Sequence, residues 1–306
     1  MSSSSTSQSV FEAGKYATTF LRVEPAISAL ATSPPKPLLI ATPSDEGEFP
    51  LLVFLHGYLF YNSFYSQLIQ HIASHGFIVI APQLYCVAGP DTSDEIKSAA
   101  ATTNWLSDGL HNVLPIKVRP SLTKVGLAGH SRGGKVAFAL ALGQTTTLKF
   151  SALMGIDPVD GMDKGNQTPP PVLTYIPRSF DLKMAVLVVG SGLGEVKKNP
   201  LFPPCAPKGV NHEDFFNECR APAWYFVAKD YGHVDMLNDD TKGIRGKASY
   251  CLCKNGKSRE PMRRFVGGIV VAFMRAHLEG DYSDLMAIKE GPEIAPVELK
   301  TVDFRV

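Results

Sequence analysis

The chain has 306 residues, of which 44% are hydrophobic and 19% charged, and its formal net charge is +1. This composition is typical of a soluble globular protein that has one large core, or one domain with loop insertions. The small net charge predicts no nucleic-acid partner, and no apolar run approaches the roughly 20 residues that cross a bilayer.

The first 35 residues have the pattern of a flexible tail and linker. Residues 1–10 are rich in serine and have no apolar core, so they do not resemble a secretory signal. They lack acidic residues, as organelle transit peptides do, but arginine is absent before Arg22. We therefore predict a protein that is not secreted, with a tail over residues 1–35 and a single domain over residues 36–306.

From residue 36 onward, apolar runs that suit strands alternate with helical patterns. We expect strands over residues 36–42, 49–57, 77–82, 125–128, 150–156, 185–191 and 223–228, and helices over residues 63–74, 92–110, 135–142 and 263–277. Such alternation predicts a mostly parallel sheet with helices on both faces. Two long connections, residues 161–183 and 192–222, interrupt the pattern, and loops of this length usually carry function or are disordered.

The segment Gly129-His-Ser-Arg-Gly133 matches the pattern G-x-S-x-G between an expected strand and an expected helix. This context is that of a nucleophile elbow, a tight turn that presents the serine at the carboxyl edge of the sheet. Side chains at the flanking glycines would collide with the neighbouring strand and helix. The pattern therefore predicts an α/β-hydrolase fold with Ser131 as nucleophile and the backbone N–H of Arg132 as an oxyanion donor.

In this fold the partners of the serine follow in the order Ser, acid, His. His233 comes directly after the last expected strand and is the candidate general base. Its nearest rival, His212, lies inside the second long connection and follows no strand. The remaining histidines precede the serine or lie on expected helices, so His233 is preferred.

Three acidic residues are candidates for the group that orients the base. Asp157 ends the strand after the elbow, and Asp160 follows three residues later. Glu195 follows the next strand, which is the commoner place for the acid in this fold. We favour the two aspartates, and the sequence does not decide between them, because an aspartate before a proline often only shapes a turn.

The loop after the expected strand at residues 49–57 is the place for a second oxyanion donor. Tyr58, with Leu59 beside it, is the candidate. An aromatic cluster surrounds this position and consists of Tyr58, Phe60, Tyr61, Phe64 and Tyr65. These rings form either a wall that contacts a large apolar substrate or a buried core under the loop.

The sequence offers no cofactor site and no metal site. It contains neither a Walker phosphate loop nor a G-x-G-x-x-G segment after a strand. Cys251 and Cys253 lack the spacing of common zinc or redox sites, so we expect packed or free thiols there. Cys205 and Cys219 lie around an insertion, and the sequence does not decide whether they pair.

Six segments resemble plant chlorophyllases, and the similarity runs from about residue 36 to residue 280. They are residues 129–135, 155–161, 168–172, 190–195, 199–207 and 243–247. The resemblance implies hydrolysis of the phytyl ester of chlorophyll to chlorophyllide and phytol by a Ser–His–Asp triad. It places the serine on Ser131, the histidine on His233, and the aspartate on Asp157 or Asp160.

Two other functions share these features. A general lipase or polyester esterase would carry the same elbow, whereas a pigment carrier without catalysis would not need the complete triad. The resemblance implies chlorophyll as the partner and no cofactor. It leaves open whether the protein lies in the chloroplast, associates peripherally with other intracellular membranes or is cytosolic, and it does not predict the oligomeric state.

Overall fold

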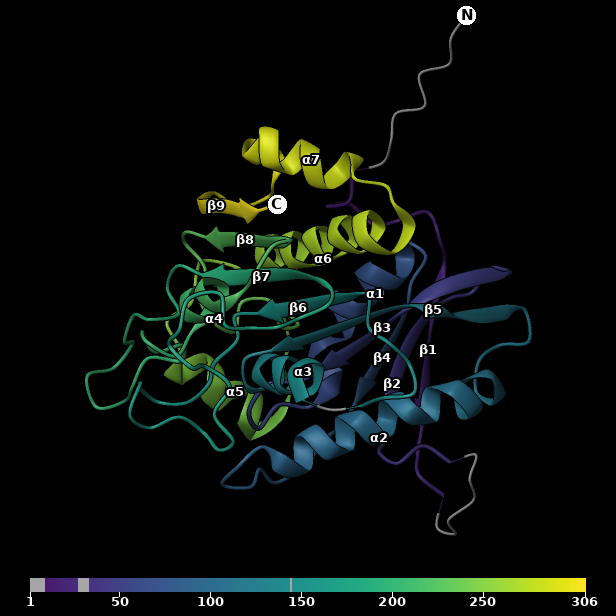
Figure 1. Ribbon diagram of the computed structural model, residues 1–306, viewed down its shortest axis with the longest axis horizontal. Helices are drawn as coiled ribbons and strands as arrows, with labels where there is room; N and C mark the ends of the chain where they lie inside the picture. The colour runs from purple at the N-terminus through teal and green to yellow at the C-terminus, as the bar shows by residue number, and fades with distance from the viewer. Residues whose placement is uncertain (1–8, 27–32, 144) are drawn as a thin grey trace, which may run out of the picture.

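The computed structural model describes residues 9–26, 33–143 and 145–306 (Figure 1). Nine strands of this described part form one sheet in the order β1-β2-β4-β3-β5-β6-β7-β8-β9. They are β1 (Thr18–Val23), β2 (Leu38–Pro43), β3 (Gly47–Leu55), β4 (Ile78–Pro82), β5 (Val118–His130), β6 (Ala152–Ile156), β7 (Ala185–Ser191), β8 (Ala223–Ala228) and β9 (Leu299–Arg305). Strands β3 to β8 run parallel, whereas β1, β2 and β9 pair antiparallel with their neighbours.

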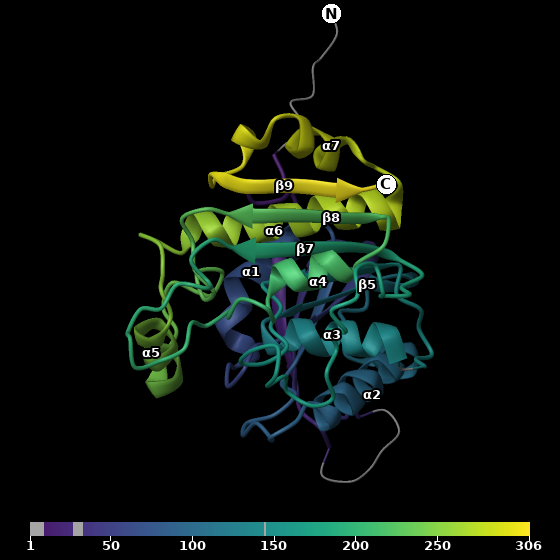
Figure 2. The same ribbon diagram turned by 60° about the vertical axis from the view of Figure 1, so that its left-hand side comes forward.

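Helices cover both faces of the sheet (Figures 1 and 2). They are α1 (Ser66–Ser74), α2 (Ser93–Gly109), α3 (Arg132–Gly143), α4 (His212–Glu218), α5 (Gly243–Leu252), α6 (Glu260–Met274) and α7 (Ser283–Glu290). Shorter helical turns lie at Asn62–Tyr65, Leu110–Asn112 and Pro292–Ile294, and Arg275–Glu279 continues α6 as a π-helix. Helices α1 and α6 share one hydrophobic core with one face of the sheet, whereas α2, α3 and α4 share the core of the other face.

The central strands explain why the sequence predicted this arrangement. Leu51, Leu52, Val53, Phe54 and Leu55 of β3 are each at most 1% exposed. A strand that is covered on both faces needs apolar side chains at every position rather than at alternate positions. The mostly parallel sheet between two helical layers therefore confirms the predicted α/β-hydrolase fold class.

The structure corrects the expectation of a flexible tail through residue 35. Strand β1 pairs with β2 at the edge of the sheet, and Val10 and Phe11 are 3% exposed. The ring of Phe11 packs against that of Phe265 on α6, with their centres 6.4 Å apart. Burial of these side chains and strand pairing hold residues 9–23 against the domain, whereas residues 1–8 and 27–32 lie outside the described residues.

The chain does not end with the helix predicted at residues 263–277. Figure 2 shows α7 and β9 beyond β8 at one edge of the sheet. Strand β9 extends the sheet antiparallel to β8. Strand β9 has no clear signal in the sequence, because it is half-buried and mixes charged with apolar residues.

A disulfide joins the second insertion to the chain after α5. Cys205 and Cys253 form this bond, with Cα atoms 5.5 Å apart. The expectation of a packed or free thiol is therefore wrong for Cys253. Cys219 does not pair with Cys205 and is a buried thiol near the carbonyl of Phe215, whereas Cys251 is free and exposed.

Candidate active site

Ser131 lies in the tight turn between β5 and α3. Its φ is +56°, a left-handed conformation that costs free energy for a residue with a side chain. A Cβ on Gly129 would lie 2.1 Å from the carbonyl oxygen of Gly133, and a Cβ on Gly133 would lie 2.4 Å from that of Leu55. Both glycines of the motif are therefore required by close backbone contacts.

The structure brings Ser131, His233 and Asp157 together from the ends of three strands. His233 follows β8, and its Nε2 lies 2.8 Å from Oγ of Ser131. Its Nδ1 lies 2.7 Å from Oδ2 of Asp157, the first residue after β6. A neutral imidazole that donates Nδ1–H to this carboxylate leaves Nε2 able to accept the serine proton. The arrangement can therefore activate a serine oxygen for attack on an ester.

The carboxylate of Asp157 is fully buried and is held from several sides. Ser191, the last residue of β7, donates its N–H to Oδ1 at 3.1 Å and its hydroxyl to Oδ2 at 2.5 Å. Burial alone would raise the pKa of Asp157. The hydrogen bond from His233, the charges of His233 and His212, and the hydrogen bond from Ser191 outweigh burial and lower this pKa to about 2. The carboxylate therefore stays ionised at neutral pH while it orients the imidazole.

A second histidine, His130, lies beneath the catalytic pair in a buried hydrogen-bond chain. Its Nε2 lies 2.8 Å from the backbone carbonyl of His233, which can only accept, so Nε2 carries the proton. Nδ1 of His130 must then accept the hydroxyl proton of Tyr65, at 2.7 Å. The same Tyr65 oxygen accepts the N–H of Gly57 at 3.0 Å. This chain fixes the loops after β3 and β8 to the turn that carries Ser131.

The guanidinium of Arg132, the residue directly after Ser131, is buried against the loop that follows β4. It binds the carboxylate of Glu95 with Nε and Nη2 at 2.6 to 3.1 Å. Nη2 also donates to the carbonyls of Gly89 and Asp91. A guanidinium fork matches a carboxylate in two places at once, so this contact fixes an orientation as well as a distance. The elbow and the 89–95 loop are therefore held as one unit.

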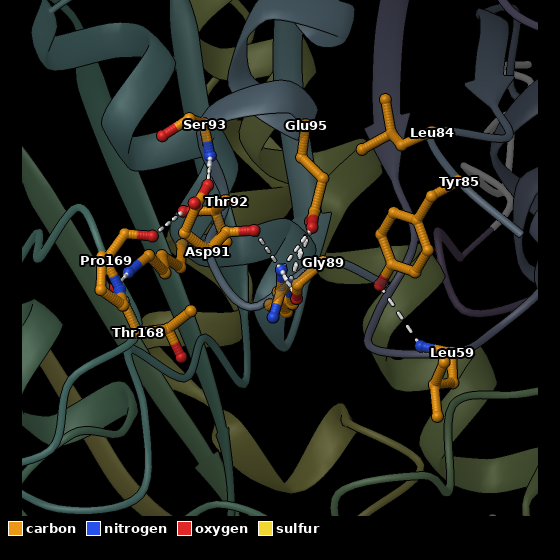
Figure 3. Close-up of polar contacts among 12 residues, drawn as sticks. Leu59, Leu84, Tyr85, Gly89, Asp91, Thr92, Ser93, Glu95, Thr168 and Pro169 are labelled. Carbon is orange, nitrogen blue, oxygen red and sulfur yellow. Dashed lines mark hydrogen bonds and ion pairs between the residues drawn. The ribbon is translucent and has the colours of Figure 1, made fainter. Parts of the chain in front are cut away.

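The loop after β3 lies against the same guanidinium. The ring centres of Tyr58 and Tyr85 are 5.5 and 5.9 Å from its carbon, within range of cation–π attraction. Leu59, whose φ is +58°, donates its N–H to the hydroxyl of Tyr85 at 3.3 Å (Figure 3). Among the described residues, the N–H of Tyr58 has no hydrogen-bond partner. Of the two candidate donors in this loop, Tyr58 is therefore the one that can bind an oxyanion.

The comparisons with known proteins identify the family of the chain. The family model described as Chlorophyllase matches residues 6–306. The chain belongs to the chlorophyllase family. It is 62% identical to chlorophyllase-2 of Arabidopsis thaliana, over 97% of this chain and 98% of the relative. It is 46% identical to chlorophyllase-1 of Arabidopsis thaliana, over 97% and 93% of the two chains. It is 44% identical to the chloroplastic chlorophyllase-1 of Citrus unshiu, over 96% and 88%.

In this chlorophyllase-family protein, Asp160 lies apart from the imidazole and organises the first insertion. Its Oδ1 pairs with Nζ of Lys135 at 2.6 Å, and both side chains are at most 1% exposed. Its Oδ2 accepts hydrogen bonds from Gln167 Nε2 at 2.5 Å and from the N–H groups of Val172 and Leu173 at 3.0 and 2.8 Å. The structure therefore places Asp157, rather than Asp160, against His233.

The other two alternatives of the sequence analysis have different outcomes. Glu195 is exposed, and within the described part of the chain no hydrogen bond or ion pair joins it to Ser131, His233 or Asp157. His212, the first residue of α4, donates or accepts a hydrogen bond with the hydroxyl of Tyr225 through Nδ1, and its Nε2 lies 3.8 Å from Oδ1 of Asp157. The second insertion thus reaches the carboxylate of the site, a contact that the sequence pattern does not indicate.

The aromatic cluster after β3 divides into buried and exposed rings. Phe60 is 7% exposed and stacks on His130, with ring centres 6.0 Å apart, so of the two interpretations left open for this ring the buried core applies. Phe64 and Tyr65 are also buried, whereas Tyr58 and Tyr61 are 51% and 36% exposed. The core interpretation therefore applies to the three buried rings, and only the two exposed tyrosines are available to a substrate.

The described residues contain neither a metal-binding cluster nor a membrane-spanning helix. No group of three or more His, Cys, Asp or Glu side chains in that part of the chain is placed to hold a metal ion. No helix within it has the length and apolarity that a membrane crossing requires.

Proposed function

We propose that the protein hydrolyses the phytyl ester of chlorophyll to chlorophyllide and phytol, with Ser131 as nucleophile, His233 as base and Asp157 as orienting acid. The observation that carries the proposal is the position of His233, which contacts Ser131 Oγ through one ring nitrogen and Asp157 through the other. Membership of the chlorophyllase family supports the choice of substrate, since relatives at 62% and 46% identity are named chlorophyllases.

Acylation begins when Oγ of Ser131 attacks the ester carbonyl carbon and its proton passes to Nε2 of His233. The carbonyl oxygen becomes an oxyanion, which accepts hydrogen bonds from the N–H groups of Arg132 and Tyr58. The imidazolium is stabilised by the ionised Asp157. Collapse of the intermediate breaks the bond to the phytyl oxygen, which takes the proton from Nε2 and leaves as phytol.

Deacylation repeats these steps with water. Nε2 of His233 accepts a proton from a water molecule, and the resulting hydroxide attacks the acyl-enzyme carbonyl. When the intermediate collapses, Oγ of Ser131 regains its proton from the imidazolium and chlorophyllide leaves as the free acid. No cofactor is needed, because proton transfer and oxyanion binding supply all the chemistry.

We also propose peripheral contact with an intracellular membrane, in the chloroplast or elsewhere in the cell. Leu201, Phe202 and Ile244 are 87%, 46% and 88% exposed and lie in the two segments that flank the disulfide. Exposed apolar side chains of this kind commonly mark contact surfaces. Two Citrus relatives are named chloroplastic, which supports the chloroplast as one compartment.

The test is incubation of the purified protein with chlorophyll in detergent, followed by chromatography for chlorophyllide. We expect Ser131→Ala to lower turnover on the order of 10⁴-fold or more, because triad members act as a unit. Ser121→Ala is the matched control, since Ser121 is another buried serine on β5 and lies far from the elbow along the strand. It should retain wild-type turnover.

Three outcomes would change the proposal. A Ser131→Ala variant with a tenth of wild-type turnover would remove Ser131 as nucleophile. Tight chlorophyll binding without product in the wild-type protein would indicate a pigment carrier. Rapid cleavage of short nitrophenyl esters with almost none of chlorophyll would indicate a general esterase.

A further inference from the structure

Asp157, the acid of the proposed triad, has a histidine near each oxygen of its carboxylate. Nδ1 of His233 lies 2.7 Å from Oδ2, whereas Nε2 of His212 lies 3.8 Å from Oδ1. The side chain of His212 is only 12% exposed, so this imidazole is nearly buried beside the acid. The mechanism proposed above moves protons through His233 alone. It therefore leaves the second imidazole without a role.

Several contacts fix the position of the His212 ring. Tyr225, on β8, makes a hydrogen bond of 2.7 Å with Nδ1 through its hydroxyl. The ring lies directly on the backbone of Gly190 in β7, where an added Cβ would come within 2.4 Å of Nδ1. Asn211 caps the start of α4, and its side chain accepts the N–H of Glu213 at 3.1 Å. Two strands and a capped helix therefore hold this ring beside the acid.

The hydrogen bond to Tyr225 determines which nitrogen of a neutral His212 carries the proton. A phenol hydroxyl can donate or accept, whereas the carboxylate of Asp157 can only accept. If the hydroxyl donates to Nδ1, the hydrogen is on Nε2, the nitrogen 3.8 Å from the carboxylate. In the other tautomer Nε2 would bring a lone pair to a negative charge. The ionised acid therefore selects the tautomer with hydrogen on Nε2, and at this distance the contact is electrostatic rather than a hydrogen bond.

Among the described residues, the titratable groups around His212 are acidic. They are Asp157 after β6, Glu195 after β7, Tyr225 on β8, and Glu213 and Asp214 on α4 itself. Burial, followed by the charge of Glu213, raises the pKa of Tyr225, so its hydroxyl stays neutral. Within the same part of the chain, none of the four carboxylates pairs with a lysine or an arginine. The acid of the triad therefore has two histidines, and no permanent cation, as partners for its charge.

A positive charge on His212 would affect both other members of this contact. Burial raises the pKa of Asp157, whereas the hydrogen bond and charge of His233, the charge of His212 and a hydrogen bond from Ser191 lower it to about 2. The same charge repels a proton on His233, because like charges near one carboxylate disfavour each other. Both effects favour the active form of the site, in which Asp157 is ionised and His233 is free to accept a proton.

We propose that His212 is a positioning residue of the triad, which keeps Asp157 ionised beside a neutral His233 and so extends catalysis to lower pH. This role depends on the triad proposed above. His212 acts through the carboxylate and not on the ester, so its removal should change the pH dependence of the reaction more than its maximal rate.

The first experiment measures kcat/KM for nitrophenyl acetate from pH 5 to pH 9 in the full-length protein. This small ester reports on the triad whether or not chlorophyll is the substrate. His212→Gln, which cannot take up a proton, should move the acid limb of the profile to higher pH by about half a pH unit. His212→Lys, whose charge is permanent in this range, should move it to lower pH. Both variants should remain within about threefold of the wild-type value at pH 8.

His111→Gln, at an exposed histidine, is the matched control and should leave the acid limb in place. Opposite displacements in the two His212 variants would support an effect of charge, since a loss of packing alone would act in one direction. Displacement of both limbs in the same direction, or of neither, would overturn the proposal. Thermal unfolding of each variant establishes that folded proteins are compared.

A second experiment, which needs no lysine variant, tests whether His212 acts through Asp157. A fluorescent fluorophosphonate reacts with an activated serine, so its rate at pH 6 measures the activation of Ser131. His212→Gln should lower this rate about threefold in the wild-type protein, as a half-unit displacement of the limb implies. In Asp157→Asn it should lower the rate less than about 1.5-fold, because no carboxylate charge remains to be stabilised. Equal reductions in both backgrounds would refute action through the acid.

The same rates distinguish a failure of this role from a failure of the proposed function. If Asp157→Asn reacts as fast as the wild-type protein, the triad itself is wrong and the proposed function fails with it. If Asp157→Asn loses reactivity and His212→Gln does not, only the role of His212 is refuted.

Discussion

Two regions near the carboxyl edge of the sheet differ in whether their side chains have partners within the chain. In the buried support, which comprises His56, Gly57, Tyr65, His130 and Asp157, each donor faces an acceptor within the chain. In the α5 surface, which comprises Leu201, Phe202, Ile244, Tyr250 and Leu252, the side chains are 40% to 88% exposed.

The difference reflects what each region must do. Groups that stabilise a transition state act best when they are already in position, because no reorganisation is then needed during the reaction. We propose that the α5 surface, besides the membrane contact proposed above, meets the apolar chain of the substrate, and such a surface must remain open until a ligand covers it. The fold therefore separates a rigid buried support from an open apolar surface, and substitutions in the two regions should affect different properties of the protein.

The largest effect is expected from the two aspartates after β6. Asp157→Asn should lower kcat about 10⁴-fold, because an amide favours the wrong imidazole tautomer. Asp160→Asn should retain most of the activity but lose about 3–5 kcal/mol of stability, since it leaves Lys135 buried without its partner. Chlorophyll turnover and urea unfolding measure the two properties separately. If Asp160→Asn instead abolished turnover and Asp157→Asn only lowered stability, Asp160 would be the acid that orients His233.

The buried support should also make the fold sensitive to acid. Burial, followed by the charge of His233, lowers the pKa of His130 to about 3, and burial lowers the pKa of His56 to about 4. The unfolded chain takes up protons at these histidines below its pKa of about 6.5, whereas the folded chain does not, so stability is complete above pH 6.5 and falls below it. Each histidine should contribute a loss of about 2 kcal/mol between pH 7.5 and pH 5.

Urea unfolding at the two pH values tests this expectation. His130→Gln should reduce the pH-dependent loss by about 2 kcal/mol, even if the variant is less stable at both values. His111→Gln, at an exposed histidine, is the control and should leave the loss unchanged. An equal loss in His130→Gln and the wild-type protein would show that other groups cause the acid sensitivity.

Tyr65→Phe should show whether the buried support also affects the rate of catalysis. The change leaves Nδ1 of His130 and the N–H of Gly57 without partners in the interior, which costs about 1–3 kcal/mol. We expect kcat to fall about tenfold, with KM changed less than twofold, because the loops that position His233 and Tyr58 lose their common anchor. Stopped assays over a range of chlorophyll concentrations separate the two constants.

Tyr225→Phe is the matched control for that variant. The hydroxyl of Tyr225 contacts His212 rather than the support of His233, so kcat should fall less than threefold. If both tyrosine variants lose activity equally, the buried support has no special role in positioning the base.

The smallest effect is expected from the α5 surface. The double variant Leu201→Ser and Phe202→Ser should raise KM for chlorophyll about fivefold, which corresponds to about 1 kcal/mol of lost apolar contact. It should leave the hydrolysis of nitrophenyl acetate unchanged, since a small ester does not reach this surface. Ile116→Ser, at a fully exposed residue before β5, is the control and should change neither constant. Equal losses on both esters would instead indicate damage to the site itself.

Local pattern was sufficient to predict the central part of the fold. The continuous apolar runs gave the expected positions of β3, β4 and β6 to β8, and the elbow glycines indicated Ser131. The position of His233 after the last expected strand indicated it as the candidate base. These features depend on neighbours in sequence, which is why a single sequence reveals them.

Contacts between distant residues were outside the reach of the sequence. The choice between Asp157 and Asp160 depends on contacts with Lys135, with Ser191 and with residues 167–173, none of which is adjacent to the aspartates in sequence. Tyr65 and His130 are 65 positions apart, and no spacing rule connects them. Strand β1 was missed for a similar reason, because its pairing with β2 rather than its own pattern holds it in place.

The Cys205–Cys253 bond closes a covalent ring in the chain, and part of the site lies within this ring. The two cysteines are 48 residues apart, and the ring includes His212, β8 and His233. In the chain-entropy description, a cross-linked loop of this size raises the free energy of the unfolded chain by about 4 kcal/mol, because it removes conformational entropy. A single protease cut inside the ring would therefore leave both histidines covalently attached to the enzyme until a reductant opens the bond.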